Sequence, residues 1–70
     1  MTHKGDLNRA KILAAIDAYR NAHGYGPTYA EIAHAVDLHP ATVGRHVRLM
    51  RRWGTVRGNG RRTRSVEVVQ

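Results

Sequence analysis

The residues with the strongest chemical character in this chain are its arginines, and most of them lie in one half of the sequence. Residues 41–70 hold eight arginines against a single carboxylate, Glu67, whereas residues 1–40 carry equal numbers of basic and acidic side chains. The whole net charge of +7 therefore belongs to the second half. A guanidinium group presents a planar fork of donors that matches phosphate oxygens and the edge of guanine. The pattern favours a polyanionic partner, although a genome rich in G and C would also raise the arginine content.

No other group of residues is arranged for catalysis or for metal binding. The chain has no cysteine, which excludes a disulfide framework and a thiolate zinc site. The histidines at 34, 39 and 46 do not follow a zinc spacing, and no clustered carboxylates accompany them. We find no nucleophile with a base, no acid pair and no phosphate-binding glycine loop. The sequence therefore predicts a protein that is not an enzyme and needs no metal or cofactor.

The length and composition predict one small helical domain covering residues 1–70. Only four residues are aromatic and none is phenylalanine, so the core must consist mainly of Ala, Val, Ile and Leu. No stretch approaches the roughly 18 apolar residues of a membrane span, and the N-terminus lacks the apolar region of a signal peptide. We expect a cytoplasmic protein that does not contact a membrane.

The first helix is predicted over residues 6–23. Asp6 is a reasonable N-cap, and Gly24 is a reasonable stop. The apolar residues that recur at helical spacing are Ile12, Leu13, Ile16 and Tyr19. The opposite face, expected to be solvated, carries Lys11, Asp17, Arg20 and Asn21.

The second helix is predicted over residues 29–36. Pro27 ends the preceding segment, because the residue before a proline is pushed out of the α region. Thr28 and Glu31 then form a capping box, in which each side chain binds the backbone amide of the other residue. The buried stripe of this helix should be Ile32, Ala33 and Val36.

The third helix is predicted over residues 40–53, after a tight turn. Asp37 tolerates the left-handed conformation that such a turn requires. His39 can cap the helix modestly, and Pro40 suits its first position because the amide that proline lacks would be unpaired there. Gly54 ends the helix, and Trp53 before it is expected to cover the core.

Residues 55–69 predict a β-hairpin. Val56, Val66 and Val68 alternate so that they face the helices, and the three residues expected to face outward are Arg57, Ser65 and Glu67. The tip combines Gly58-Asn59-Gly60 with a basic run, and its glycines are expected to make it flexible.

Two short helices joined by a tight turn and followed by a basic hairpin are typical of a winged helix-turn-helix, a mainly α fold with a small β-hairpin. Residues 24–56 resemble the N-terminal DNA-binding domain of LexA-type repressors and related phage and bacterial regulators. The most specific parts are the Gly-Tyr-x-Pro-Thr-x-x-Glu-Ile-Ala opening and the Thr42-Val43-x-Arg45 stretch. Asp37 departs from the glycine usual in the turn. Since the chain ends before any self-cleavage or dimerisation domain, those functions are not expected.

The geometry of the third helix predicts which residues contact DNA. Val43, Val47 and Met50 share one face at about 100° per residue, and three arginines lie opposite them. The alternative is an ordinary solvated face, but this helix has no acidic residue at all. The predicted contacts here are His39, Pro40, Ala41, Thr42, Gly44, Arg45, Arg48, Arg51 and Arg52.

Individual roles on this helix follow from position. Arg45, near the middle, suits guanine, and Ala41 and Thr42 suit a thymine methyl group. Arg51 and Arg52 suit phosphates. Gly44 indicates a close approach of the helix backbone to DNA, although a merely tolerated glycine is nearly as good an explanation.

Further contacts are predicted from the hairpin and from the start of the second helix: Thr28, Tyr29, Arg57, Asn59, Arg61, Arg62 and Arg64. The hairpin could lie along the DNA backbone or place an arginine in a narrow minor groove. A basic loop without a defined target is the alternative, and packing is the alternative for Tyr29.

The predicted function is sequence-specific binding of double-stranded DNA by a phage or bacterial transcriptional regulator, repressor-like in type. The chain could act as a DNA-assisted dimer or array, with a polymerase as a further partner. An architectural protein such as an excisionase, a recombination directionality factor that assists an integrase, would use the same surface. A third interpretation is a winged-helix module that binds proteins.

Overall fold

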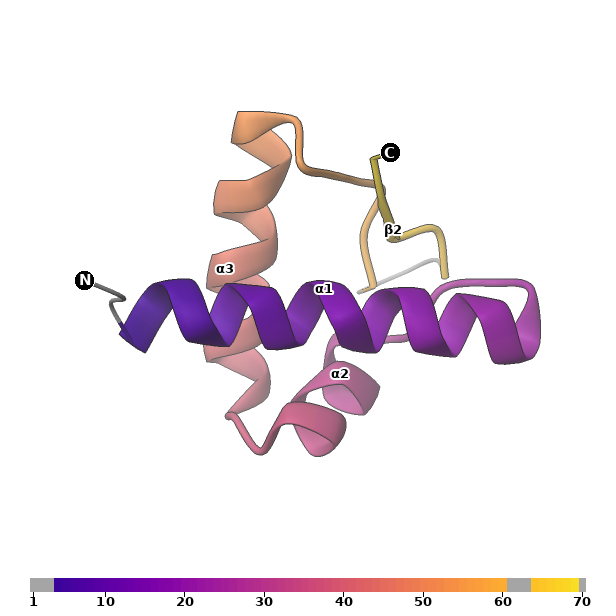
Figure 1. Ribbon diagram of the computed structural model, residues 1–70, viewed down its shortest axis with the longest axis horizontal. Helices are drawn as coiled ribbons and strands as arrows, with labels where there is room; N and C mark the ends of the chain where they lie inside the picture. Colours follow the sequence, from indigo (N-terminus) through magenta and orange to yellow (C-terminus); the bar gives the residue numbers. More distant parts are fainter. Residues whose placement is uncertain (1–3, 61–63, 70) are drawn as a thin grey trace.

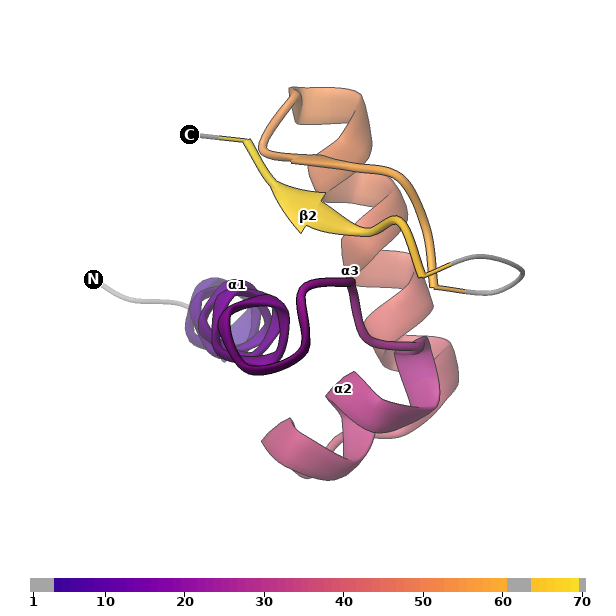
Figure 2. The same cartoon turned by 90° about the vertical axis from the view of Figure 1, so that its right-hand side faces the viewer.

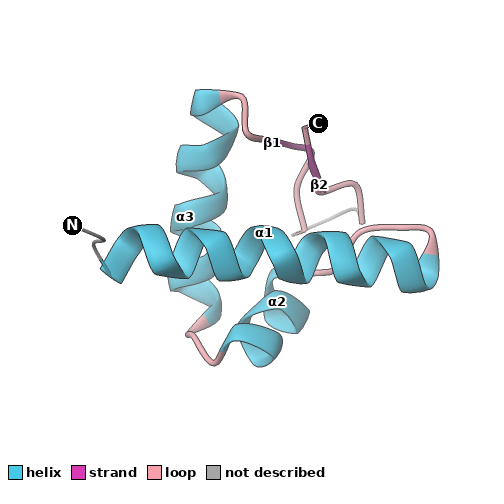
Figure 3. Cartoon of the chain, in the orientation of Figure 1, coloured by secondary structure: helices cyan, strands magenta, loops and turns pink. Residues whose placement is uncertain are grey.

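The computed structural model describes residues 4–60 and 64–69, in which three helices are followed by a two-stranded hairpin (Figure 1). The elements are α1 (Lys4–His23), α2 (Tyr29–Val36), α3 (Pro40–Trp53), β1 (Val56–Arg57) and β2 (Glu67–Val68). Figure 3 shows the helical character of the chain, with the short strands confined to its end. This is a winged helix-turn-helix, as the sequence predicts.

The core lies where the three helices and the hairpin meet. Helix α1 crosses in front of α3, and the hairpin lies on the opposite side of α1 from α2 (Figures 1 and 2). Helix α2 packs on both other helices, β1 packs on α3, and β2 packs on α1. The buried side chains of the core cluster are Ile12, Ile16, Ile32, Ala33, Val43, Val47, Met50, Val56 and Val66, and Pro27 is fully buried as well. Among the described residues no polar or charged side chain is buried, so this small core depends on apolar packing alone.

Helix α1 begins earlier than the sequence predicts. Its first residue is Lys4, so Asp6 lies inside the first turn instead of capping it. The Asp6 carboxylate forms an ion pair with Arg9 one turn later, and an acidic side chain is favourable near the positive end of the helix dipole. The predicted stop is correct: Gly24 has a left-handed backbone, with φ of 81°, and its N–H donates to the Arg20 carbonyl at 2.7 Å.

The helix-turn-helix is held by the local signals that predict it. The Thr28 Oγ1 accepts the Glu31 N–H at 3.1 Å, and Glu31 Oε1 accepts the Thr28 N–H at 2.8 Å. Asp37 takes the left-handed conformation in the turn, with φ of 57°. The Nδ1 of His39 accepts the Ala41 N–H at 3.1 Å, so His39 is the N-cap of α3.

The hairpin pairs Val56 with Val68 and Arg57 with Glu67 in an antiparallel register. Val56 and Val66 are buried and Val68 packs against the core, as the alternation predicts.

Arg20 is predicted to be solvated, but in the structure its side chain binds the hairpin. Its guanidinium donates to the Val66 carbonyl at 3.1 Å and lies 3.5 Å from a Glu67 carboxylate oxygen.

The prediction that Trp53 covers the core is wrong. Its side chain is 58% exposed, and the Arg9 guanidinium lies 5.2 Å from its ring centroid. At about 100° per residue, Trp53 lies roughly 90° from the centre of the buried stripe of α3, so it reaches only the edge of the core.

The described helices include none that is both long enough and apolar enough to span a membrane.

Candidate nucleic-acid interface

Helix α3 presents a basic face to solvent, directly opposite its buried stripe. Val43, Val47 and Met50 are fully buried, whereas the residues on the opposite side are exposed. We call this exposed side the outer face; its residues are Ala41, Arg45, Arg48 and Arg52. Arg51, at its edge, is exposed as well. The buried and exposed faces of α3 therefore lie opposite each other in the fold, as helical periodicity predicts.

The eight arginines that the structure describes fall into two sets of four. Each member of the first set pairs with a carboxylate, and this set is Arg9, Arg20, Arg57 and Arg64. The second set has no ion pair within residues 4–60 and 64–69, and it consists of Arg45, Arg48, Arg51 and Arg52. All four members of the second set belong to α3. The described arginines without an ion pair are therefore gathered on one helix, whose exposed side they occupy.

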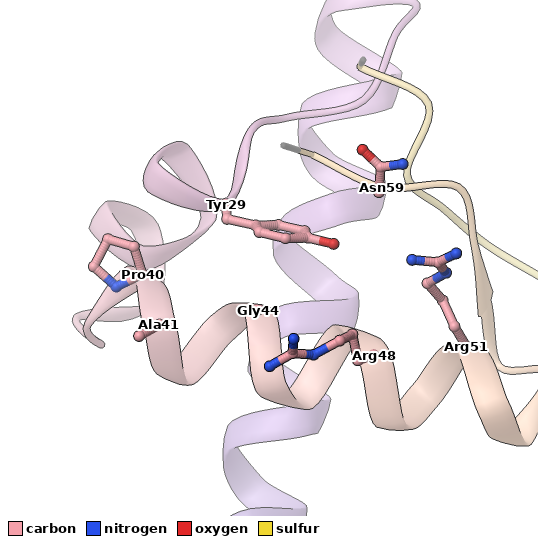
Figure 4. A pocket seen from close by; sticks show the side chains of 7 residues that line it. All are labelled: Tyr29, Pro40, Ala41, Gly44, Arg48, Arg51 and Asn59. Atoms are coloured by element: carbon pink, nitrogen blue, oxygen red, sulfur yellow. The ribbon is translucent and has the colours of Figure 1, made fainter. Parts of the chain in front are cut away.

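A hollow of about 670 Å³ runs along one side of the outer face (Figure 4). It is lined by Tyr29, Pro40, Ala41, Gly44, Arg48, Arg51 and Asn59. These residues come from three segments: the start of α2, the helix α3, and the hairpin after β1. The fold thus brings together predicted DNA contacts that are up to 30 residues apart in the sequence.

The glycine-rich tip is packed where the sequence suggested flexibility. Gly60 is buried, and its carbonyl accepts the Tyr29 N–H at 3.4 Å. A Cβ atom at position 60 would lie only 2.8 Å from the Pro27 carbonyl oxygen and 2.9 Å from the Tyr29 nitrogen. Glycine at this position therefore allows the hairpin to dock on the start of α2, which makes one continuous surface of the hairpin and the helix-turn-helix.

A profile of known proteins decides the family. The profile described as LexA DNA binding domain matches residues 7–65, which span nearly all of α1, both helices of the helix-turn-helix and β1. The chain belongs to the LexA DNA-binding domain family. Comparisons with curated proteins and with solved structures give no significant match. This LexA-type domain is a binding domain for double-stranded DNA, and the outer face of α3 belongs to its helix-turn-helix.

Within the LexA-type domain, Arg64 is turned toward the helices instead of away from them. Its Nη1 donates to Glu31 Oε1 at 2.6 Å and lies 2.9 Å from the Tyr19 hydroxyl. The guanidinium carbon is 5.4 Å from the Tyr25 ring centroid. The Gly26 N–H donates to the Arg64 carbonyl at 2.8 Å, so both the backbone and the side chain of Arg64 hold the returning arm of the hairpin.

This contact changes the chemistry of Glu31. The backbone hydrogen bond from Thr28 and the hydrogen bond from Arg64 lower the pKa of Glu31 to about 2. Glu31 was predicted only as the capping residue of α2, since the sequence offers no local signal for a partner 33 residues away. The carboxylate therefore serves two elements, the start of α2 and the hairpin.

The other predicted DNA contacts differ in exposure and in pairing. His39 and Pro40 are exposed at the start of α3, and Thr42 is half-buried. Arg57 is exposed but pairs with Glu67 across the strands. Arg61 and Arg62 lie outside the described residues. Thr28 is half-buried, with its hydroxyl oxygen engaged in the capping box.

His46 lies on the flank of α3 opposite the hollow and is not among the predicted DNA contacts. Its partial burial and the neighbouring guanidinium groups of Arg9 and Arg45 lower the pKa of its imidazole. His46 thus favours the neutral form within the basic surface. No cluster of three or more His, Cys, Asp or Glu residues suited to a metal ion occurs in the described part of the chain.

Proposed function

We propose that this LexA-type domain is a transcriptional regulator that binds duplex DNA in a sequence-specific manner, with α3 in the major groove. The observation that carries the proposal is the set of four unpaired arginines on α3 beside a hollow shared with α2 and the hairpin. An α-helix is about 10–12 Å across with its side chains, and the major groove is about 12 Å wide. The outer face would then meet the base edges.

We assign base reading to the middle of the outer face. Arg45 is exposed there and suits a bidentate contact with O6 and N7 of guanine. Ala41, one turn earlier, is small enough to lie against a thymine methyl group, and Thr42 is its neighbour on the adjoining side. Arg48 is within the same face and can reach either a base or a phosphate.

We assign backbone contacts to both ends of the interface. Arg51 and Arg52 lie in the last turn of α3, where the helix leaves the groove. His39 and Pro40 mark its other end, and the start of α2 at Thr28 adds a third point. The hairpin follows the backbone or enters the minor groove, with Arg61 and Arg62 as its predicted contacts.

The paired arginines have a different proposed role. Arg57 and Arg64 hold the hairpin in place through Glu67 and Glu31. Because an arginine already engaged with a carboxylate contributes less net charge to a phosphate contact, we expect Arg64, which pairs with Glu31 alone, to add little to the salt dependence of DNA binding. Arg57 shares the Glu67 carboxylate with Arg20, so it is only partly compensated.

A single domain of this kind would bury only about 600–1,000 Å² of protein surface on DNA. Useful affinity would therefore come from two copies on one site or from repeated sites. Footprinting on genomic DNA tests this point. One inverted pair within a promoter supports a regulator, whereas several direct repeats beside an attachment site would indicate an architectural protein.

The salt dependence of duplex affinity tests the proposed function directly. Fluorescence anisotropy with a labelled duplex should show affinity that falls steeply as salt rises. Arg52→Ala should lower the slope of log affinity against log salt by about 0.9, the value for one phosphate contact in B-form DNA. Arg64→Ala, the control with an arginine that pairs one to one with Glu31, should leave the slope unchanged. An affinity for duplex DNA that does not depend on salt would instead favour a protein-binding module.

A further inference from the structure

We propose that the hollow beside α3 holds one phosphate of the DNA backbone, gripped jointly by α2, α3 and the hairpin. This inference rests on the proposed function and identifies the group that the hollow receives. The gripping side chains are Tyr29 from α2, Arg48 and Arg51 from α3, and Asn59 from the hairpin. Figure 4 shows the Tyr29 hydroxyl directed toward the space between Asn59 and Arg51.

The chemistry of the lining favours an anion. Two guanidinium groups, a phenol and a carboxamide supply hydrogen-bond donors, and none of the described residues that line the hollow is a carboxylate. The remaining lining residues are short or lack a side chain: Pro40, Ala41 and Gly44. A chain of sugars and phosphates can therefore lie close to the helix backbone while its oxygens face the donors.

The position of the hollow favours a phosphate over a base. At about 100° per residue, Gly44 and Arg51 lie roughly 70–90° from the centre of the outer face. When the outer face meets the floor of the major groove, residues at this angle meet the groove wall, which is made of sugar and phosphate. Ala41 and Arg48 of the outer face line its near edge, so the hollow adjoins the base-reading residues at a place where a backbone contact fixes the register of α3.

Tyr29 is fixed before DNA arrives. The ring packs partly against the core, and Gly44 and Gly60 flank it on opposite edges. An ideal Cβ at Gly44 would lie 3.4 Å from the ring Cδ2, and one at Gly60 would lie 3.0 Å from Cδ1. Its backbone N–H is also tied to Gly60. A donor that is already ordered loses little conformational entropy on binding, so its hydroxyl is an efficient contact.

A chemical double-mutant cycle tests this phosphate site. The probe is a duplex with the sequence selected by the domain, carrying one neutral methylphosphonate at each backbone position in turn. Tyr29→Phe should weaken binding about tenfold, which corresponds to a hydrogen bond to a charged group. The loss should be the same for selected and scrambled duplexes, because a phosphate carries no sequence. At one backbone position, the methylphosphonate and Tyr29→Phe together should weaken binding no more than either change alone.

Tyr25→Phe is the matched control. Tyr25 is 46% exposed and stacks on His23 at the far end of α1, so its phenol lies outside the hollow, and its removal should not alter binding. Additive losses at every backbone position would overturn the phosphate site, as would a Tyr29→Phe loss confined to the selected sequence. In both cases the wild-type domain still prefers its selected duplex, so the proposed function stands. A wild-type domain that shows no duplex affinity would refute the proposed function itself.

Discussion

Replacing Gly44 with alanine should make the fold more stable and the DNA complex weaker. Gly44 lies in the interior of α3 with an ordinary helical backbone, since it is not among the glycines with positive φ. The nearest atoms to an added Cβ are Cδ2 and Cε2 of Tyr29, at 3.4 and 3.6 Å, which are ordinary van der Waals distances. The fold therefore gives no steric reason for a glycine at this position.

The size of the stability gain follows from helix propensity. Glycine in a helix interior costs about 0.5–1 kcal/mol relative to alanine. In a domain of this size, each kcal/mol shifts the melting temperature by roughly 4–8 °C. Thermal denaturation followed by circular dichroism should thus show Gly44→Ala melting several degrees above the wild type.

The loss of DNA affinity follows from the place of Gly44 in the hollow. Its bare backbone lines the hollow in which we place the DNA phosphate, and a methyl group there would push the strand outward. We expect weaker binding with an unchanged salt slope, because no charge is removed. Gly60→Ala is the contrasting variant: its Cβ would collide with backbone atoms, so it should destabilise the fold by about 1–3 kcal/mol. A Gly44→Ala variant that melts lower, or that melts higher and binds as tightly as the wild type, would refute this reasoning.

Three further predictions concern the scaffold. Ile16→Ala, in a fully buried position, should lower the free energy of unfolding by about 2–5 kcal/mol in urea titrations, whereas Leu7→Ala, at an exposed site, should change it little. Arg64→Ala should lower the melting temperature while leaving the salt slope of DNA binding unchanged, and a lower slope at constant stability would mean that Arg64 contacts DNA. The Glu31 pKa of about 2 lies below its reference value of 4.5, so its contribution to stability should be complete above pH 4.5 and lost as the pH falls toward 2. Glu31→Gln should flatten that part of the stability profile, and an unchanged profile would contradict the assignment.

The parts of the fold that the sequence predicts are those with local causes. The Thr28–Glu31 capping box, the left-handed Asp37 and the stop at Gly54 each depend on neighbours within a few residues. The start of α1 was missed by two residues because Asp6 is favourable both as a cap and within the first turn. The prediction for Trp53 is wrong because a large apolar residue at the edge of a buried stripe can point either toward the core or toward solvent.

The parts of the site that the sequence does not predict depend on contacts between distant residues. The outer face of α3 follows from periodicity alone, so its residues could be named in advance. The sequence does not show which arginines pair with a carboxylate, since Arg64 contacts Glu31 and Arg20 contacts Glu67 only after the hairpin has folded onto the helices. The sequence likewise does not predict the docking of Gly60 on Tyr29, because glycines at a hairpin tip indicate flexibility.

The most direct test of base reading by α3 is selection of bound duplexes from a random pool, carried out with the wild type and with Arg45→Ala. The wild type should select a defined sequence. Arg45→Ala should lose preference at one position, a change of about 1–3 kcal/mol for a bidentate contact with a base. Arg52→Ala, the control, should bind more weakly but select the same sequence. If Arg45→Ala selects the wild-type sequence without relaxation at any position, the outer face of α3 does not read DNA in the way proposed.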